Sequence, residues 1–348
     1  MAQAKARVLI VGTGGVGTMA AYALEKGGKA EVTAVCRSNY AHMNMYGIDI
    51  DSVDHGHRIM HWRPTNILPK VPNVKHETLQ PFDFILVTTK NCPDILPTIS
   101  DVIKHAVTAG KTAIVLSQNG LNIEKQLIER FPTNPIISSV SYISTTITPS
   151  GKLIQSDADA QNIGAFDSPC VPRSVAEEAA RRYVDIYNPA GKLDVIYDPD
   201  VKSARWHKLV YNAAFNPVAA LMRIDTTRMR MSRFIIDDLI RPIMLEVVAA
   251  ARANGVQMAD DITEIAIYVD RPYYFFKPSM CQDMEKGSFM EVETLVGEPL
   301  RQGEAKGVKM PMLRTIYSLL RGQQLRIAEE KGLWKPKWAP DNPYHSKM

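Results

Sequence analysis

The sequence predicts an α/β fold, with an N-terminal domain built on a parallel sheet and an all-helical C-terminal domain. Short apolar runs alternate with helical periodicity through the first half of the chain. Long helical patterns take over near Asp198-Pro199-Asp200, where an aspartate can cap a helix and the proline sets the preceding turn. A glycine-rich turn joins the first apolar run to the first helical segment. We therefore expect domains at residues 1–199 and 200–348.

The expected strands are short and almost continuously apolar, which is typical of strands buried on both faces of a parallel sheet. A helical segment at 18–25 and a later one at 174–187 fit crossover and flanking helices, and a turn-rich stretch covers residues 149–159. In the second half we expect long helices at 201–222, 232–254 and 292–306, whereas the proline-containing tail after Gly332 cannot form a regular helix. The strands are expected at residues 7–11, 31–35, 82–88, 112–116, 136–140 and 193–197.

Composition excludes several classes of protein. The 348 residues carry a net charge of +4, from 41 basic and 37 acidic side chains, without a dense basic block, so a nucleic-acid partner is not expected. No apolar run reaches the roughly 18–20 residues that a membrane span needs, and no membrane partner is expected. The four cysteines form neither a C-x-x-C pair nor a zinc-like cluster, which favours a reducing, cytoplasmic location and no metal site.

The segment Gly12-Thr13-Gly14-Gly15-Val16-Gly17 has the spacing of a dinucleotide-binding turn. It follows a predicted strand and opens a predicted helix, which is the context that the motif requires. The first glycine permits the tight turn, the second permits close approach of a pyrophosphate, and the third permits helix–strand packing. A glycine turn without a ligand is the alternative. The first domain is therefore predicted to be of the Rossmann type.

The second strand ends at Cys36-Arg37-Ser38, where NAD enzymes usually carry an acid that binds the ribose hydroxyls. Arg37 is instead suited to a 2′-phosphate, because its guanidinium is always charged and can bind phosphate through two N–H groups. The sequence thus predicts NADP(H), although Arg37 could be only a surface residue. Lys90 and Asn119 follow two further strands, where ligands of parallel sheets bind.

Lys208, Asn212 and Asn216 are spaced at i, i+4 and i+8, which places them on one face of a helix among mostly apolar neighbours. Such a polar stripe suits an oxygen-rich small molecule, but a solvated helix face is equally compatible. Pro217 should bend or weaken the helix. Downstream, Ser279 precedes Glu291 by twelve residues, and Glu291 is expected in the first turn of a helix that begins at Met290.

These motifs occur together and in order: GTGGVG, TTKN, SQNG, W-x-K-L-x-x-N-x-x-x-N-P, and P-S-M-x-Q-D followed by a glutamate. The combination, over roughly residues 7–315, resembles the ketopantoate reductases (2-dehydropantoate 2-reductases). The resemblance implies NADPH-dependent reduction of 2-dehydropantoate to pantoate, on the way to pantothenate and coenzyme A. It also implies a small-molecule 2-keto acid as the partner and is compatible with a homodimer.

The resemblance further implies individual roles. Lys208 would be the general acid, and Glu291 would orient substrate and cofactor. Asn119, Lys90 and Arg37 would bind the cofactor, with Asn119 also near the substrate. The glycine turn would bind the pyrophosphate, and the substrate would be held by Asn212, Asn216 and Ser279.

The sequence departs from the family in four places. Position 15 is glycine, where alanine is common. A histidine-containing region spans residues 40–64, and we expect a loop near the adenine end there. The aromatic segment 268–276 could line a substrate entrance or pack in the core, and the former would favour another 2-keto acid, lactone or natural-product ketone. About 18 residues of the tail extend past the family core. Their terminal Ser346-Lys347-Met348 is close to a peroxisomal address, and a bland polar tail is the alternative. A non-catalytic NADP(H) sensor is a third, less favoured interpretation.

Overall fold

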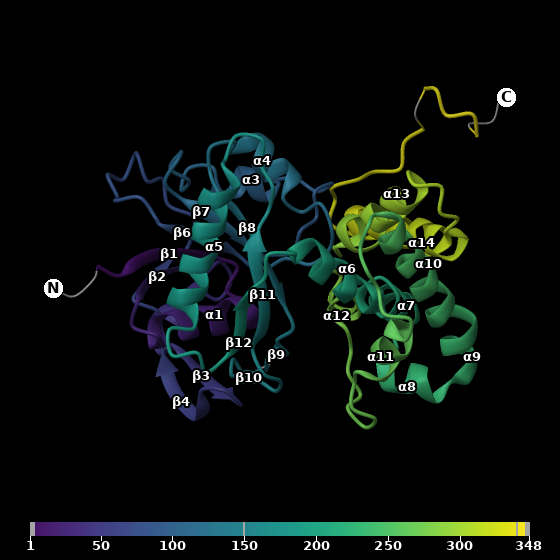
Figure 1. Cartoon of the computed structure of the whole chain (residues 1–348), viewed down its shortest axis with the longest axis horizontal. Coiled ribbons are helices and arrows are strands. Elements are labelled where there is room, and N and C mark those ends of the chain that lie inside the picture. Colours follow the sequence, from purple (N-terminus) through teal and green to yellow (C-terminus); the bar gives the residue numbers. More distant parts are fainter. Residues whose placement is uncertain (1–3, 149, 339, 345–348) are drawn as a thin grey trace. The chain divides into compact units, whose positions relative to one another are not determined.

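A computed structural model describes residues 4–148, 150–338 and 340–344 of the chain (Figure 1). It consists of two compact units, Met1–Lys208 and Leu209–Met348, and the division falls within helix α6 (Val201–Asn212). The first unit contains two sheets with flanking helices. From residue 209 onward, the described residues form helices and connecting segments only. The α/β fold with a helical second half is therefore confirmed.

The main sheet has eight strands in the order β12-β11-β8-β7-β6-β1-β2-β5. From β8 to β5 all neighbouring strands are parallel, β11 is antiparallel to β8, and β12 is parallel to β11. The parallel part has the Rossmann order, with its switch point between β1 and β6. The strands are β1 Ala6–Val11, β2 Ala30–Val35, β5 Asn66–Leu68, β6 Phe84–Val87, β7 Ala113–Leu116, β8 Ile136–Ser141, β11 Ala160–Ala165 and β12 Asp194–Tyr197.

Side chains of alternating residues fill two hydrophobic cores, one on each face of this sheet. Val8 and Ile10 of β1 point into the core that contains Leu24 of α1 (Gly15–Lys26) and Tyr183 of α5 (Arg173–Tyr187). Leu9 and Val11, which alternate with these residues along β1, point to the second face of the sheet. Helices α3 (Ile99–Ile103) and α4 (Lys125–Arg130) cover that face. Burial on both faces explains why these strands have almost no polar alternation.

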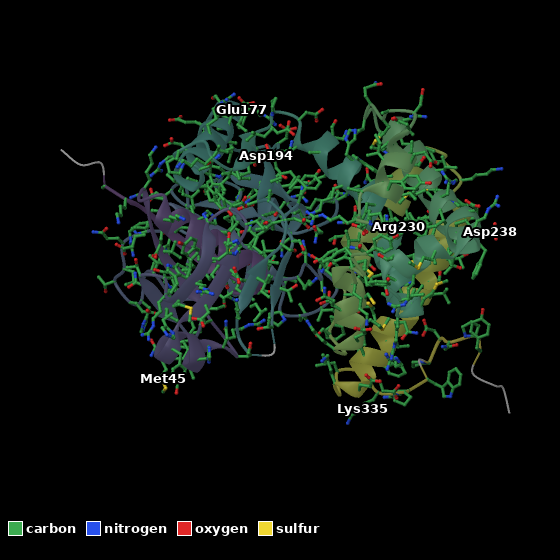
Figure 2. All side chains as sticks on the ribbon, turned by 90° about the horizontal axis from the view of Figure 1, so that it is seen from below. Met45, Glu177, Asp194, Arg230, Asp238 and Lys335 are labelled. Atoms are coloured by element: carbon green, nitrogen blue, oxygen red, sulfur yellow. The ribbon has the colours of Figure 1, made fainter. Side chains whose placement is uncertain are left out.

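The region of residues 40–64 is not the expected loop. It forms helix α2 (Tyr40–Tyr46) and strands β3 (Ile48–Ser52) and β4 (Gly56–Trp62). These strands join β10 (Leu153–Gln155) and β9 (Thr145–Ile147) in a second sheet of order β4-β3-β10-β9. The turn-rich stretch expected at 149–159 therefore contains a strand. Met45, labelled in Figure 2, is exposed near the end of α2.

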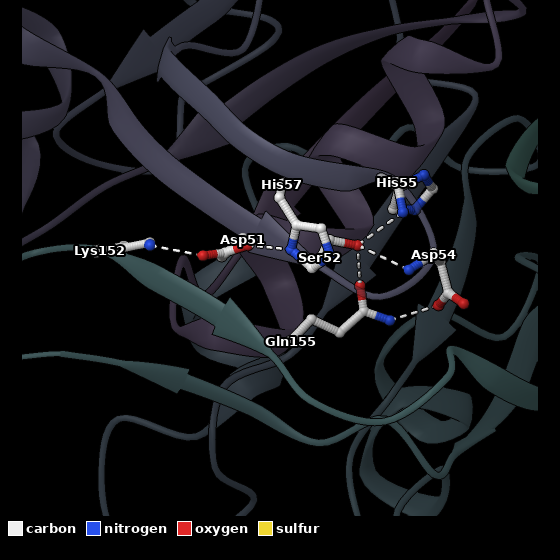
Figure 3. A network of polar contacts seen from close by, with 7 residues as sticks. All are labelled: Asp51, Ser52, Asp54, His55, His57, Lys152 and Gln155. Carbon is white, nitrogen blue, oxygen red and sulfur yellow. Dashed lines mark hydrogen bonds and ion pairs between the residues drawn. The ribbon is translucent and has the colours of Figure 1, made fainter.

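Polar side chains link the two halves of the second sheet (Figure 3). Asp51 on β3 contacts His57 on β4 and forms an ion pair of 2.6 Å with Lys152. The hydroxyl of Ser52 donates to Gln155 Oε1 at 2.6 Å across the parallel β3–β10 pair. The sheet is thus held by contacts between segments about 100 residues apart in sequence.

The same network continues to the main sheet through Asp159. Its backbone amide donates to Asp54 Oδ2 at 2.8 Å, and its carboxylate accepts from Tyr187 and Gln161. Burial raises the pKa of Asp159, although the hydrogen bonds from Tyr187 and Gln161 act in the opposite direction. These contacts tie the second sheet to strand β11 and helix α5.

The second unit is a helical bundle in which α10 (Arg241–Ala253) packs on α13 (Glu298–Glu304) and α14 (Pro311–Glu330), and α7 (Phe215–Met222) packs on α12 (Ser279–Glu285) (Figure 1). The expected helix at 232–254 is nearly continuous, and the one at 292–306 begins with a π-helical turn. The helix expected at 201–222 is interrupted at Ala213-Ala214. The elements are α7 Phe215–Met222, α8 Thr226–Met231, α9 Arg233–Ile235, η1 Ile236–Ile240, α10 Arg241–Ala253, α11 Ile262–Tyr268, α12 Ser279–Glu285, η2 Glu293–Gly297, α13 Glu298–Glu304 and α14 Pro311–Glu330.

Helix α14 ends at Glu330, and the described residues of the tail form no regular helix, as predicted. Trp334 and Trp338 are exposed there. The terminal Ser346-Lys347-Met348 lies outside the described residues. Among the helices that the structure describes, none has the length and apolar character needed to cross a bilayer.

Candidate active site

The glycine turn follows β1 directly, and its geometry requires glycine at two positions. Gly12 has φ of +111°, and a Cβ there would lie 2.7 Å from the amide nitrogen of Thr89. A Cβ on Gly17 would lie 1.9 Å from the carbonyl oxygen of Gly12. A Cβ on Gly14 would meet no atom within 4 Å, so the space beside the middle glycine is open. This is the arrangement in which a dinucleotide pyrophosphate can approach the backbone.

The first amides of helix α1 have no hydrogen-bond partner among the residues that the structure describes. The first intrahelical hydrogen bond runs from Thr18 N–H to Gly14 O at 2.9 Å, so the amides of Gly15, Val16 and Gly17 precede it. No side chain caps this end. Three amide donors and the positive end of the helix dipole therefore favour an anion.

The end of β2 is tied to the glycine turn. The Thr13 hydroxyl donates to Val35 O at 3.2 Å, and the Asn39 side-chain amide donates to Thr13 O at 3.3 Å. Arg37, between these anchored positions, is exposed and makes no ion pair in the described part of the chain. Its guanidinium is therefore available to an anionic ligand. Sequence reasoning missed Asn39, whose role depends on this contact across 26 residues.

The carboxyl ends of β6 and β7 lie beside the turn and carry the next predicted residues. Lys90 is exposed just after β6, and Asn119 is half-buried just after β7. Gln118 links the two loops, because its side-chain amide donates to Thr89 O at 2.8 Å. Sequence reasoning did not identify Gln118, although it is the residue adjacent to Asn119.

Lys208 lies against the same edge of the sheet. Its ammonium group donates to Asn119 Oδ1 at 2.8 Å and to the carbonyl oxygen of Ser141, and it lies 5.4 Å from the ring centroid of Tyr142. The Oε1 atom of Gln118 and the hydroxyl of Ser141 are buried without a hydrogen-bond partner among the described residues. Unsatisfied buried polar atoms are costly, so their presence beside a lysine and a carboxamide fits a site completed by a polar ligand.

Arg205, one turn before Lys208 in α6, fixes the helix to the sheet. Its buried guanidinium donates to Ser138 Oγ at 2.9 Å, to the carbonyl oxygens of Gln118 and Gly120 at 3.0 and 2.9 Å, and to that of Leu116 at 3.4 Å. The three carbonyl acceptors flank Asn119 in sequence. Arg205 therefore positions both partners of the Lys208–Asn119 contact.

Tyr142 is the large side chain beside the ammonium group, and no local sequence pattern marks it. Burial raises the pKa of its hydroxyl and Asp198 raises it further, while Arg205 acts in the opposite direction. The ring face can stabilise the positive charge of Lys208.

The other predicted residues lie in the second unit. Asn216 and Glu291 are each 3% exposed, and Asn212 is 8% exposed. Ser279 is the first residue of α12, which packs on the helix that contains Asn216. Burial of Asn212 and Asn216 is hard to reconcile with the alternative of a solvated stripe.

Two expectations about these residues were wrong. Asn216 does not continue the helix of Lys208 and Asn212, because α6 ends at Asn212 and α7 begins at Phe215. Pro217 explains the interruption, since it has no N–H for the carbonyl four residues earlier and its ring clashes there. Glu291 immediately precedes the helical residues rather than lying in the first turn, and its carbonyl accepts from Leu295 N–H at 3.1 Å.

Comparison with known proteins identifies the family. The sequence model described as ketopantoate reductase PanE/ApbA matches residues 8–168, and that of its C-terminal domain matches residues 200–324. The crystal structure of 2-dehydropantoate 2-reductase from Methylococcus capsulatus is 30% identical with a TM-score of 0.75, and the match covers 92% of this chain and 98% of that one. The chain belongs to the ketopantoate reductase family, whose members are oxidoreductases.

Two further proteins show how wide the similarity is. An uncharacterized protein of Saccharomyces cerevisiae is 34% identical, over 94% of this chain and 96% of its own length. The ternary structure of D-mandelate dehydrogenase with NADH and anilino(oxo)acetate is only 16% identical but has a TM-score of 0.76, over 92% of this chain and 99% of that one. The latter similarity concerns the fold alone.

Within this ketopantoate reductase fold, the aromatic segment 268–276 is largely exposed. Tyr268, Tyr273, Tyr274 and Phe275 have exposed fractions of 71%, 84%, 42% and 50%. Core packing is therefore the wrong explanation for these four side chains. Arg228 lies over the ring of Phe275 at 4.8 Å, which orders part of the segment.

Proposed function

We propose that this protein reduces 2-dehydropantoate to pantoate with NADPH, with Lys208 as the general acid. The observation that carries the proposal is the position of the Lys208 ammonium group. Asn119 and the Ser141 carbonyl hold it at the edge of the sheet where the glycine turn also lies. Membership of the ketopantoate reductase family supports the substrate.

A nicotinamide dinucleotide suits the first unit. The glycines leave room for a pyrophosphate, the first turn of α1 offers three amides, and Arg37 offers a guanidinium for a 2′-phosphate. The D-mandelate dehydrogenase of similar fold binds NADH. When bound, the reduced nicotinamide would supply a hydride to the C2 ketone of the substrate.

The protein's own contribution is electrostatic and acid–base. As the ketone is reduced, negative charge develops on its oxygen, and the Lys208 ammonium group can stabilise that charge and then donate a proton. Asn119 accepts from the ammonium group and thereby orients it. We propose that Asn212, Asn216 and Ser279 bind the hydroxyl and carboxylate of the substrate, and that Glu291 orients it.

Substitution of Lys208 tests the mechanism. Loss of a general acid lowers rates by about 10²–10⁴-fold, so we expect Lys208→Ala to lower kcat with 2-dehydropantoate by about 10²-fold or more while NADPH still binds. NADPH consumption is followed by absorbance, and binding by the fluorescence of the reduced cofactor. Near-normal kcat in this variant would refute the assigned role.

Substitution of Arg37 tests the cofactor. Arg37→Ala should raise the Kd for NADPH by at least tenfold and leave that for NADH nearly unchanged, because only NADPH carries the 2′-phosphate; ion-assisted hydrogen bonds contribute about 1.5–3 kcal/mol. An equal rise in the Kd for both cofactors would show that Arg37 does not bind the 2′-phosphate, on which the proposal of NADP(H) rests.

A second substrate class is a bulkier 2-oxo acid or ketone. The ring of Tyr142 beside Lys208 favours it, because an aromatic surface next to the general acid can pack against a larger apolar substituent. A panel of 2-oxo acids with increasing substituent size separates the two. Turnover of 2-dehydropantoate thousands-fold below that of a bulkier substrate would favour the second class.

A further inference from the structure

Strand β9 brings one hydroxyl group over the first turn of α1. If Gly15 carried a Cβ, that atom would lie 2.5 Å from Thr145 Oγ1 and 2.8 Å from Thr145 Cβ. The Thr145 side chain therefore occupies the space that alanine would fill at position 15. The glycine at this position is thus matched to a threonine 130 residues later in the chain.

The hydroxyl of Thr145 lies beside the N-terminus of α1, where an anionic ligand needs hydrogen-bond donors. The unpaired amides of Gly15, Val16 and Gly17 are at the same end of α1, and the space beside Gly14 is open. No hydrogen bond of the Thr145 hydroxyl occurs within the described residues. A half-buried hydroxyl without a protein partner, beside three unpaired amides, is arranged to donate to the same anion.

The backbone holds Thr145 in this position. Thr145 pairs with Gln155 of β10, and Gln155 is fixed by Ser52 and Asp54. The neighbouring Thr146 is exposed and, because side chains alternate along a strand, points to the opposite face. The second sheet therefore presents one threonine, and not its neighbour, to the N-terminus of α1.

We propose that Thr145 is a cofactor-binding residue whose hydroxyl donates a hydrogen bond to the dinucleotide pyrophosphate, and that Gly15 is glycine in order to admit it. The inference rests on the proposed dinucleotide-binding function. It gives the second sheet a role in the site, since that sheet supplies a donor that the glycine turn lacks. It also explains why position 15 carries glycine, since the methyl group of an alanine there would clash with the Thr145 side chain.

Binding measurements on substituted proteins test this. Thr145→Val keeps the shape and removes the donor, so the Kd for NADPH should rise about tenfold or more, as expected for a hydrogen bond to a charged group. The Kd for NADH should rise by the same factor, because both cofactors contain the pyrophosphate. Thr145→Ser should bind as the wild type does, and Thr146→Val is the matched control that should leave the Kd unchanged.

Two further measurements separate a direct contact from damage to the fold. Adenosine 2′-phosphate lacks the pyrophosphate, and its Kd should be the same for wild type and Thr145→Val. Gly15→Ala should weaken NADPH binding strongly in the wild type but add little in a Thr145→Ala background, because the clash is then absent. If the effects of the two substitutions on the Kd were simply additive, the inference that Gly15 is needed to make room for Thr145 would be wrong.

The outcomes for the two proposals are distinct. If the wild type binds NADPH but Thr145→Val binds it equally well, the role of Thr145 is refuted and the proposed function stands. If the wild type binds neither NADPH nor NADH, the proposed function itself fails.

Discussion

Arg205 allows a quantitative prediction, because the residue is only 4% exposed and its guanidinium has four oxygen acceptors in the first unit. Arg205→Met removes all these donors and fills similar volume. Each buried acceptor left unsatisfied costs about 1–3 kcal/mol, and partial relaxation should limit the total to about 3–5 kcal/mol. With a urea m-value of about 2–3 kcal/mol/M, the unfolding midpoint should fall by about 1–2.5 M.

The assay is urea unfolding followed by intrinsic fluorescence, for which the buried Trp206 beside Arg205 is a natural probe. Lys29→Met is the matched control, because Lys29 forms an ion pair of 2.7 Å with Asp185 in which both side chains are substantially exposed. Such surface pairs contribute about 0–1 kcal/mol. A midpoint for Arg205→Met as close to the wild type as that of Lys29→Met would refute the view that Arg205 anchors α6.

Three further predictions concern single positions. Gly17→Ala should abolish NADPH binding or folding, because its Cβ would lie 1.9 Å from a backbone oxygen; normal binding in titration would contradict the turn geometry. Tyr142→Ala should lower kcat about 3–30-fold, because Lys208 loses the ring contact, about 0.5–2 kcal/mol, that holds its ammonium group in place; Tyr142→Phe should retain kcat, and equal losses would show that the hydroxyl matters instead. Burial of Asp225 disfavours its charged form, but hydrogen bonds from the Arg228 amide and guanidinium outweigh this and lower its pKa. Asp225→Asn should therefore lower the free energy of unfolding by about 1 kcal/mol at neutral pH. The difference in stability between the two proteins should disappear as the pH falls below 3.8, the ordinary pKa of the group, and through the lower pKa of Asp225 in the folded protein. A difference that does not depend on pH would exclude the charge of Asp225 as its origin.

The main sheet could be predicted because its signals are local. A run such as residues 84–87 is buried on both faces, so its apolar character alone marks a strand. The glycine turn is equally local, since the required spacing lies within six residues. The helix break before Phe215 could also be anticipated from Pro217, although its exact position could not.

The second sheet could not be predicted, because its stability comes from distant partners. Strand β4 is mostly exposed and contains no clear alternation, and β3 acquires its central position only by pairing with β10. For the same reason Tyr142 and Thr145 gave no signal. Their importance lies in contacts with Lys208 and with the space above Gly15, both far away in sequence.

The strands of the second sheet are synthesised at different times. The β3–β4 hairpin leaves the ribosome about 90 residues before its partner β10, so the edge of β3 remains unpaired during that interval. Unpaired edges are sites at which chains associate wrongly, and charged side chains are a common protection. Asp51, which later pairs with Lys152, supplies such a charge on the waiting strand. The carboxylate that forms an ion pair in the finished protein thus first places a negative charge on an unpaired strand edge, where charge disfavours wrong association.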